Sequence, residues 1–207
     1  MPCNSTLTGY ARDCQPNVGG LRALYIANAG WHGTATNNDV VGLVPEYYDA
    51  DKYAIAANAS GSYTFNSVPS GTTPLPFKKY DLPKAGATLT HAATVDPSTG
   101  VQVVESRVTV YLDNLNNARR LEFNRLLGGQ FVVVAEDNMG NFVLLGCPLD
   151  FSSADYDDLR TSPCEASAGD ATSGAQLSEA NRAILTLSCF SNIMPPAGSS
   201  PDSWVAS

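Results

Sequence analysis

The block from Ala87 to Cys147 constrains the fold more than any other part of the chain, because turn signals separate strand-like segments there at short intervals. ATLTHAATV and VQVVESRVTVYLD alternate apolar and polar residues on either side of DPSTG (96–100), whose proline and glycine are typical of a tight turn. A long hairpin is therefore predicted. The valines of its second strand change phase between Val104 and Arg107, which predicts a β-bulge near Glu105–Ser106.

A helix is predicted over 114–127, directly after this hairpin. Asp113 or Asn114 can cap its start, and Gly128–Gly129 favours a left-handed end. Apolar residues recur three to five positions apart and are expected to pack on the sheet: Leu115, Ala118, Leu121 and Leu126. The polar side of the same helix carries three arginines: Arg119, Arg120 and Arg125.

Strands are predicted on both sides of this helix. QFVVVAE and NFVLLGC flank the turn DNMG (137–140), and their unbroken apolar runs favour a central place in the sheet. Further strand patterns cover 21–28, 40–48, 62–68, 176–191 and, beside three prolines, an edge strand at 77–82. Strands and helices do not alternate, so we expect a mainly β fold: an antiparallel β-sandwich or barrel with one flanking α-helix.

Long loops are expected in what we interpret as a single domain over residues 1–207. Residues 29–75 are rich in small and polar residues and are interpreted as a projecting excursion. Residues 149–175 hold six carboxylates against one arginine, which predicts an acidic loop. A loop of this length inside a compact domain is usually functional or makes contacts.

Both ends of the chain are expected to be extended arms. Residues 1–20 are polar and glycine-rich and form the predicted N-terminal arm. The predicted C-terminal arm covers 192–207, because Pro195–Pro196 lacks two backbone donors and is not expected to extend the interior of a sheet. Trp204 is its single hydrophobic anchor.

Charge and apolar content limit the partners of such a chain. Lys plus Arg number 12 against 20 Asp plus Glu, a formal net charge of −8, so it is not expected to grip a nucleic-acid backbone. No apolar run approaches the roughly 20 residues that span a bilayer, and the start lacks the pattern of a signal peptide. We expect synthesis in a cytoplasm, with five reduced, structural cysteines: Cys3, Cys14, Cys147, Cys164 and Cys189.

No catalytic, cofactor-binding or metal-binding motif is found in the sequence. Phosphate-binding glycine loops and the G-x-S-x-G nucleophile pattern are missing. His32 in a loop and His91 in a strand lack an orienting partner nearby in the sequence, and both are interpreted as structural. The acidic residues lack the glycine and glutamate spacing of a calcium loop: Asp155, Asp157 and Asp158. We therefore expect neither an enzyme nor a cofactor.

The N-terminal string CNSTLTGYARDCQPNVGGLR (Cys3–Arg22), with LYIAN close behind, resembles small structural proteins encoded by phages and prophages of Bacteroidetes bacteria. Further matches to that group lie at Phe77–Tyr80 (FKKY), in the hairpin at Val95–Val101 and at Ala118–Glu122 (ARRLE). The resemblance covers roughly residues 1–147. It implies a virion component, assembled in the cytoplasm of a bacterial host.

Among virion components, the strand–turn–strand–helix–strand–turn–strand order is similar to that of a tail tube subunit. This resemblance implies a β-sandwich or barrel with one flanking helix, in hexameric rings that stack around a DNA conduit. Its partners would be copies of itself and other virion tail proteins, while DNA passes without specific binding. A low charge content of 15% also suits a subunit that buries surface against its own copies.

Two alternatives remain open from the sequence. One is a capsid accessory or head–tail connector protein, which differs in symmetry. The other is a carbohydrate- or receptor-binding β-module, which needs a platform of exposed aromatic residues: Trp31, Tyr47, Tyr48, Tyr53 and Tyr63. We favour core or interface positions for these aromatics, since interfaces are enriched in Tyr and Trp.

Contacts between subunits are the candidate sites that this interpretation predicts. The helix arginines Arg119, Arg120 and Arg125 are expected to lie outside the ring and to face solvent or the acidic loop of a neighbour. The predicted contact residues of that loop and of the C-terminal arm are Asp155, Asp157, Asp158 and Trp204.

Overall fold

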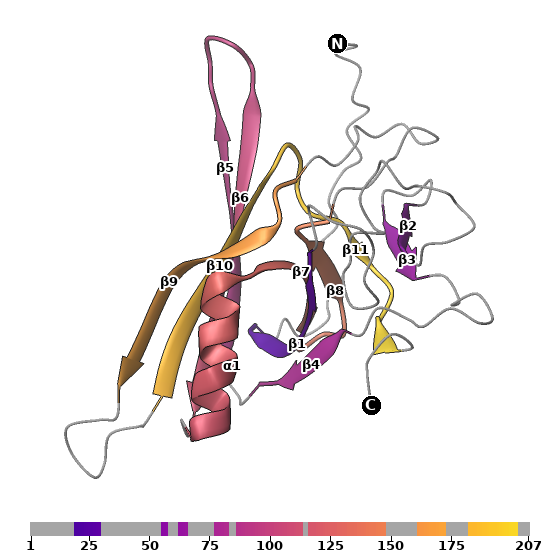
Figure 1. Cartoon of the computed structure of the whole chain (residues 1–207). Coiled ribbons are helices and arrows are strands. Elements are labelled where there is room, and N and C mark those ends of the chain that lie inside the picture. Colours follow the sequence, from indigo (N-terminus) through magenta and orange to yellow (C-terminus); the bar gives the residue numbers. More distant parts are fainter. Residues whose placement is uncertain are drawn as a thin grey trace, which may run out of the picture.

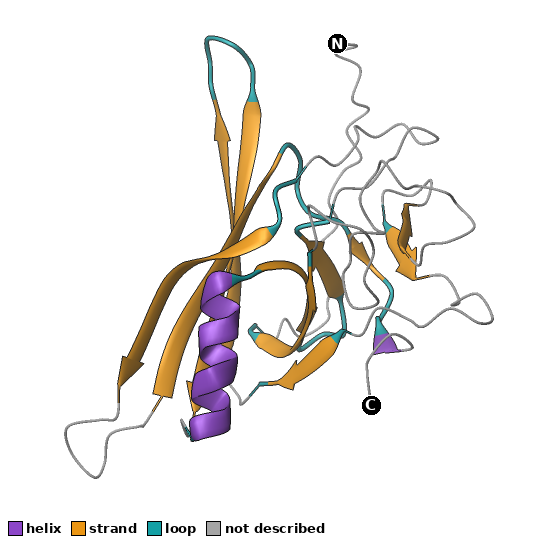
Figure 2. Ribbon diagram, viewed as in Figure 1, coloured by secondary structure: helices purple, strands orange, loops and turns teal. Residues whose placement is uncertain are grey.

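The computed structural model describes residues 19–29, 55–57, 62–65, 77–82, 86–113, 116–147, 161–172 and 182–202. In this part of the chain strands make up 62% of the residues and there is one helix, so the expected mainly β class is confirmed. The strands form a mixed sheet that does not close (Figure 2). The expected sandwich or barrel is therefore not confirmed.

The described residues form eleven strands and one helix (Figure 1). The first six strands are β1 (Leu21–Asn28), β2 (Ile55–Ala57), β3 (Tyr63–Phe65), β4 (Lys78–Asp81), β5 (Ala87–Val95) and β6 (Gln102–Asp113). The helix and the remaining strands are α1 (Asn117–Gly128), β7 (Gln130–Asp137), β8 (Phe142–Leu145), β9 (Cys164–Thr172), β10 (Arg182–Ser191) and β11 (Ala197–Gly198). The order from β5 to β8 is the one that the sequence predicts.

Strand β7 is the junction of the sheet, because other strands occupy both of its edges. β1 runs antiparallel along one edge. The other edge is shared by β8, which pairs with Val133–Glu136, and by β9, which pairs with Gln130 and Phe131. Every residue from Phe131 to Glu136 is buried. The hairpin β7–β8 is therefore central, as its apolar runs predict.

Gly146 lies where the partner of β7 changes from β8 to β9. Its φ of +75° is in the left-handed region, which other residues rarely adopt. A Cβ here would lie 2.7 Å from the carbonyl oxygen of Phe131 and 2.8 Å from the backbone nitrogen of Cys164. Glycine is thus required both by the backbone conformation and by the close approach of two other strands.

Four long strands in the order β9–β10–β6–β5 form an antiparallel part of the sheet. The pairing of β5 with β6 has no register shift, so the predicted bulge near Glu105–Ser106 is wrong. Ser106 is 1% exposed and continues the inward face of β6, whereas Val103 points outward and is 41% exposed. A buried serine and exposed valines produced the apparent phase change in the sequence.

The acidic loop expected at 149–175 is contradicted where the structure describes it, because part of this segment is strand β9. Cys164–Thr172 is a strand that pairs antiparallel with β10 along most of its length. Its small and polar residues have weak strand propensity, so the sequence gives little sign of it. The long edge of β10 supplies the hydrogen-bonding partner that makes the segment a strand.

The boundaries of helix α1 differ from the prediction. Asn116, not Asp113 or Asn114, is the N-cap, and its side chain accepts a hydrogen bond from the backbone of Arg119 at 2.9 Å. The helix ends at Gly128, and Gly129 has an extended φ of −104°, so the predicted left-handed end is wrong. A Cβ on Gly129 would lie 2.2 Å from the ring of Phe131, which explains the glycine by packing.

The buried side of α1 also differs from the prediction. Phe123 and Leu126 are buried in the main core, whereas Leu121 is 54% exposed and Ala118 is exposed. The prediction is therefore right for Leu126, wrong for Ala118 and Leu121, and outside the described residues for Leu115. Only the C-terminal half of α1 is anchored, since the large ring of Phe123 docks there against β9.

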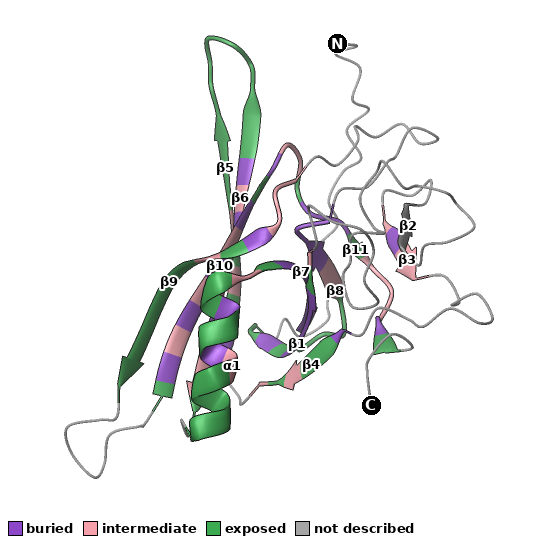
Figure 3. Cartoon of the chain, in the orientation of Figure 1, coloured by how far each residue is buried: buried purple, intermediate pink, exposed green. Residues whose placement is uncertain are grey.

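Apolar side chains cover both faces of β7, and Figure 3 accordingly colours this strand as buried along most of its length. The main core joins Phe131 and Val133 to residues of β1, β6, β10 and α1, including Leu24, Val108, Leu185 and Leu126. By strand alternation, Val132 and Val134 point to the opposite face. Aromatic rings gather there, with centroids 5.6–6.2 Å apart in the pairs Tyr25–Phe142, Tyr63–Phe65 and Phe65–Phe77.

The C-terminal segment joins the sheet, contrary to the expectation for residues 192–207. β11 lies between β8, with which it is antiparallel, and β3, with which it is parallel. Pro195 and Pro196 are buried, and the carbonyl of Pro196 accepts a hydrogen bond from the backbone of Leu144 at 3.1 Å. Proline has no backbone N–H to donate, but its carbonyl oxygen can still accept a hydrogen bond, and this contact requires only the carbonyl.

Several predicted features lie outside the described residues or are only partly described. The strand at 40–48 and nearly all of the N-terminal arm lie outside. Of the excursion at 29–75, β2 and β3 are described, and they belong to the sheet rather than to a projection. The edge strand at 77–82 is confirmed, since β4 pairs with β1 alone among the described strands.

We predict that Gly146→Ala destabilises the protein far more than Gly100→Ala. Gly100 has a similar φ of +70° but nothing within 4 Å of an added Cβ. Gly100→Ala should therefore cost about 1–2 kcal/mol of backbone strain, whereas Gly146→Ala adds backbone clashes and should cost more than about 3 kcal/mol. Urea unfolding of both variants measures the difference, and equal losses would contradict the role given to Gly146.

Candidate functional site

The three arginines of α1 all lie exposed, as the sequence predicts. The Arg125 guanidinium lies 3.3 Å from the carboxylate of Glu122, which also accepts a hydrogen bond from the Tyr80 hydroxyl at 2.5 Å. Arg119 donates from its guanidinium to the backbone carbonyl of Asp113. Arg119 and Arg125 therefore already contact polar groups of their own chain.

The predicted acidic partners of these arginines are not brought together with them in the described structure. Asp155, Asp157, Asp158 and Trp204 lie outside the described residues. The two acidic residues of 161–172 lie on β9, where Glu165 accepts a hydrogen bond from the Gln130 amide at 2.6 Å.

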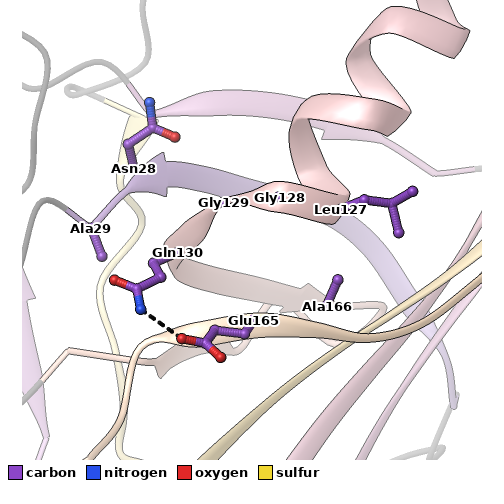
Figure 4. A pocket seen from close by; sticks show the side chains of 8 residues that line it. All are labelled: Asn28, Ala29, Leu127, Gly128, Gly129, Gln130, Glu165 and Ala166. Carbon is purple, nitrogen blue, oxygen red and sulfur yellow. Dashed lines mark hydrogen bonds between the residues drawn. The ribbon is translucent and has the colours of Figure 1, made fainter.

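Two neighbouring cavities lie beside the C-terminal half of α1. One of about 570 Å³ is bordered by the helix end, by β9 and by the Gln130–Glu165 hydrogen bond (Figure 4). The other, of about 550 Å³, has an apolar floor that includes Ile26 and Phe131 and a polar rim that includes Tyr80 and Glu122. Burial, followed by the hydrogen bond to Glu122, raises the pKa of Tyr80. At the first cavity Gln130 bonds Glu165, and at the second Tyr80 and Arg125 both contact Glu122.

A polar cluster fixes the end of the described chain to β1. The Tyr25 hydroxyl lies 3.0 Å from Asp202 Oδ1 and 3.3 Å from Glu136 Oε2, and it can donate to one carboxylate at a time. Arg22 lies 3.4 Å from Glu136 and balances its charge. Hydrogen bonds from Ser200, and then that from Tyr25, lower the pKa of Asp202.

His91 is a structural histidine, as expected. Its Nδ1 lies 2.8 Å from the Ser106 hydroxyl across the β5–β6 pair, and burial lowers its pKa. His32 lies outside the described residues. Tyr63 is fully buried, which places this aromatic in the core, as we favoured, rather than on an exposed platform.

The sequence analysis did not identify one polar surface, which is the outward face of β9–β10–β6–β5. Strand alternation places this face opposite the main core and α1. Its hydroxyl-bearing residues include Thr88, Thr90, Thr94, Thr109, Thr186 and Ser188, all exposed or half-buried. Thr88, Thr90 and Thr94 in ATLTHAAT all fall on one face and are a sequence signal for it, but a weak one, because threonine is common in strands of every kind.

The charges on this face are mixed and slightly acidic. By register, the described carboxylates and guanidiniums are those of Glu105, Asp113, Glu165 and Asp170 against Arg107 and Arg182, which leaves two negative charges. The Arg107 guanidinium forms two hydrogen bonds with Glu105, at 2.7 and 3.0 Å, which neutralise it locally. Phe190, 51% exposed, is a large apolar member at one end.

Both outer strands of this four-stranded part have open edges in the described structure. β5 pairs with β6 alone, and β9 beyond Glu165 pairs with β10 alone. β5 contains no Lys, Arg, Asp, Glu or Pro, the residues that usually protect an edge strand from further pairing. The far end of the β5–β6 hairpin projects from the molecule and exposes Val95, Val101 and Val103 (Figure 1).

Among the residues that the structure describes, no three His, Cys, Asp or Glu side chains form a group that could hold a metal ion. Within the same part of the chain, no helix has the length and hydropathy needed to cross a membrane. Comparison with known proteins finds no matching family model, no matching curated protein and no matching solved structure.

We predict that Asp202→Asn lowers stability more at pH 7 than at pH 3. The pKa of Asp202 is lower in the folded protein than its ordinary value of 3.8, so its ionised form stabilises the fold above that pH. This contribution is lost as pH falls through the folded pKa. Urea unfolding at both pH values measures it. Asp81→Asn, at an exposed carboxylate 3.8 Å from Lys79, is the control and should show little difference between them.

Proposed function

We propose that this chain is a structural subunit of a virus particle, of the tail tube type, which assembles with its own copies into hexameric rings that stack around a DNA channel. The observation that carries this proposal is the four-stranded part β9–β10–β6–β5. Among the described residues it has open edges on both sides, and its hydroxyl-rich, slightly acidic face is turned away from the core.

The open edges support assembly through strand pairing. An unprotected nine-residue edge strand such as β5 is a template for another strand. Pairing of β5 with β9 of the next subunit is head-to-tail, and head-to-tail contacts form rings when the rotation closes. The barrel that is missing from a single chain would then form between subunits, with each sheet continuing into its neighbour.

The outward face supports a channel for DNA. If this face lines the ring, the phosphates meet mostly hydroxyl groups, with two net negative charges per subunit among its described residues. Such a lining provides little of the positive charge that retains DNA, so the polymer can pass without being held. Helix α1 packs on the opposite face, so in the proposed ring its arginines would lie on the outside, away from the DNA.

The projecting β5–β6 hairpin supports stacking of the rings. Its exposed valines form an apolar tip at the end of two paired strands, a surface that contact with the next ring would cover. Other tail proteins would bind at the two ends of the stack. The assembled protein belongs to the virion and is built in the cytoplasm of the bacterial host.

We predict that Ala93→Pro blocks assembly while leaving the monomer folded. The hydrogen bonds from Tyr111 to Gly86 and from Asp96 to Val101 show that even-numbered residues of β5 direct their backbone groups at β6. The N–H of Ala93 therefore points to the open edge, where proline is tolerated in a monomer. Sedimentation velocity should show only monomers for Ala93→Pro and large assemblies for the wild type.

Ala92→Pro is the matched control, because the N–H of Ala92 points at β6. It removes a hydrogen bond within the hairpin and should cost the monomer about 3 kcal/mol in urea unfolding, against about 1 kcal/mol or less for Ala93→Pro. Wild-type assembly by Ala93→Pro would exclude the β5 edge as the subunit contact.

A further inference from the structure

Two cysteines face each other beside the junction of β7, β8 and β9. Cys164 begins β9, and Cys189 lies near the end of β10. The register of these strands shifts between Thr186 and Leu187, beyond which Ser188 pairs with Glu165, so one step further along both strands Cys189 comes opposite Cys164. Both side chains are 1% exposed and belong to the main core.

The backbone geometry of such a pair suits a covalent bridge. Facing residues in an antiparallel pair have Cα atoms about 4.5–5.5 Å apart, and disulfides span Cα distances of about 4.4–6.8 Å. Strand alternation also directs both side chains to the same face of the sheet. Both cysteines are free thiols in the structure.

The two thiols have different surroundings, which gives them different roles. Hydrogen bonds from Cys164, Thr161, Gly146 and Ser106 lower the pKa of Cys189 against the opposite effect of burial. The pKa of Cys164 is raised, because its thiol donates a hydrogen bond to Cys189 and because it is buried. Thiolate character therefore concentrates on Cys189, the better nucleophile of the pair.

We propose that Cys164 and Cys189 are an oxidation site at which a peroxide converts the two facing thiols into a disulfide between β9 and β10. The Cys189 thiolate attacks one oxygen of hydrogen peroxide and the O–O bond breaks, which gives a sulfenic acid on Cys189 and a hydroxide that takes up a proton to become water. The Cys164 sulfur then attacks the Cys189 sulfur, the S–O bond breaks, and water leaves with the Cys164 proton. Two thiols lose two electrons, and one peroxide becomes two waters.

Cys147 serves as an internal comparison. It is also 1% exposed, but it is not a member of the main core cluster that contains the other two cysteines. Burial raises the pKa of its thiol to about 12, so it has little thiolate character. Reaction at Cys164 and Cys189 but not at Cys147 would therefore reflect the pairing and hydrogen bonds described above rather than general oxidation of cysteines. This inference is independent of the proposed function.

Trypsin separates every cysteine of the chain, which makes the test direct. Cleavage after arginine puts Cys147 in the peptide 126–160, Cys164 in 161–182 and Cys189 in 183–207, and it also separates Cys3 from Cys14. The full-length protein, purified with reductant and freed of it, is treated with hydrogen peroxide, blocked with a thiol-alkylating reagent, digested without reduction and examined by mass spectrometry.

The expected product is the peptide 161–182 linked to 183–207, which disappears on reduction. The melting temperature of the oxidised protein should exceed that of the reduced protein by about 5–10 °C, because the bridge restricts the unfolded chain. Cys147→Ser should give the same linked peptide. Fully alkylated Cys164 and Cys189 after treatment, or linkage of either one mainly to Cys147, would overturn the proposal.

Cys164→Ser and Cys189→Ser test the order of the two steps. Without Cys164, the reaction should stop at a sulfenic acid on Cys189, which a 1,3-diketone probe labels in the peptide 183–207. Without Cys189, the probe should label the peptide 161–182 at least tenfold less. Equal labelling of the two peptides would contradict the assignment of Cys189 as the nucleophile, and the wild-type peptide map decides on the disulfide even if a variant does not fold.

Discussion

Strand β7 needs hydrogen-bonding partners along both of its edges and apolar neighbours on both of its faces. The rest of the structure is arranged around that requirement. β1 covers one edge, while β8 and β9 share the other. One face packs in the main core and the other lies among aromatic rings of segments far apart in the sequence. Where the partner of β7 changes from β8 to β9, two other strands approach Gly146 closely, so this position tolerates no side chain.

The same arrangement leaves the far edge of the sheet, at β5, without a pairing strand among the residues that the structure describes. β9 extends beyond its short pairing with β7, and β10, β6 and β5 follow it in the sheet, away from the junction. This part has a core and a helix on one face, a hydroxyl-rich face on the other, and an edge strand without protective charges. A chain that exposes such an edge gains by pairing it with a copy of itself, which is why we interpret the molecule as one unit of a ring.

The strands that the sequence predicted well are those with strong local signals. β1, β5 and β7 lie within a residue of their predicted bounds, because alternation or unbroken apolar runs mark them and turns end them. β9 and β11 were missed, since alanine, glycine, serine and proline become strands there only through partners far away in the chain. The facing cysteines are invisible in the sequence for the same reason: their proximity depends on the β9–β10 register. Prediction of the outer polar face also requires the strand register, because threonine alone does not distinguish a solvent-exposed face from a buried one.

Electron microscopy of the purified wild-type chain tests the central claim most directly, because the image reports assembly, symmetry and channel together. The account predicts rings with six-fold symmetry and a central channel, stacked into tubes as concentration rises. A field of single particles of 21.8 kDa at every concentration would contradict it.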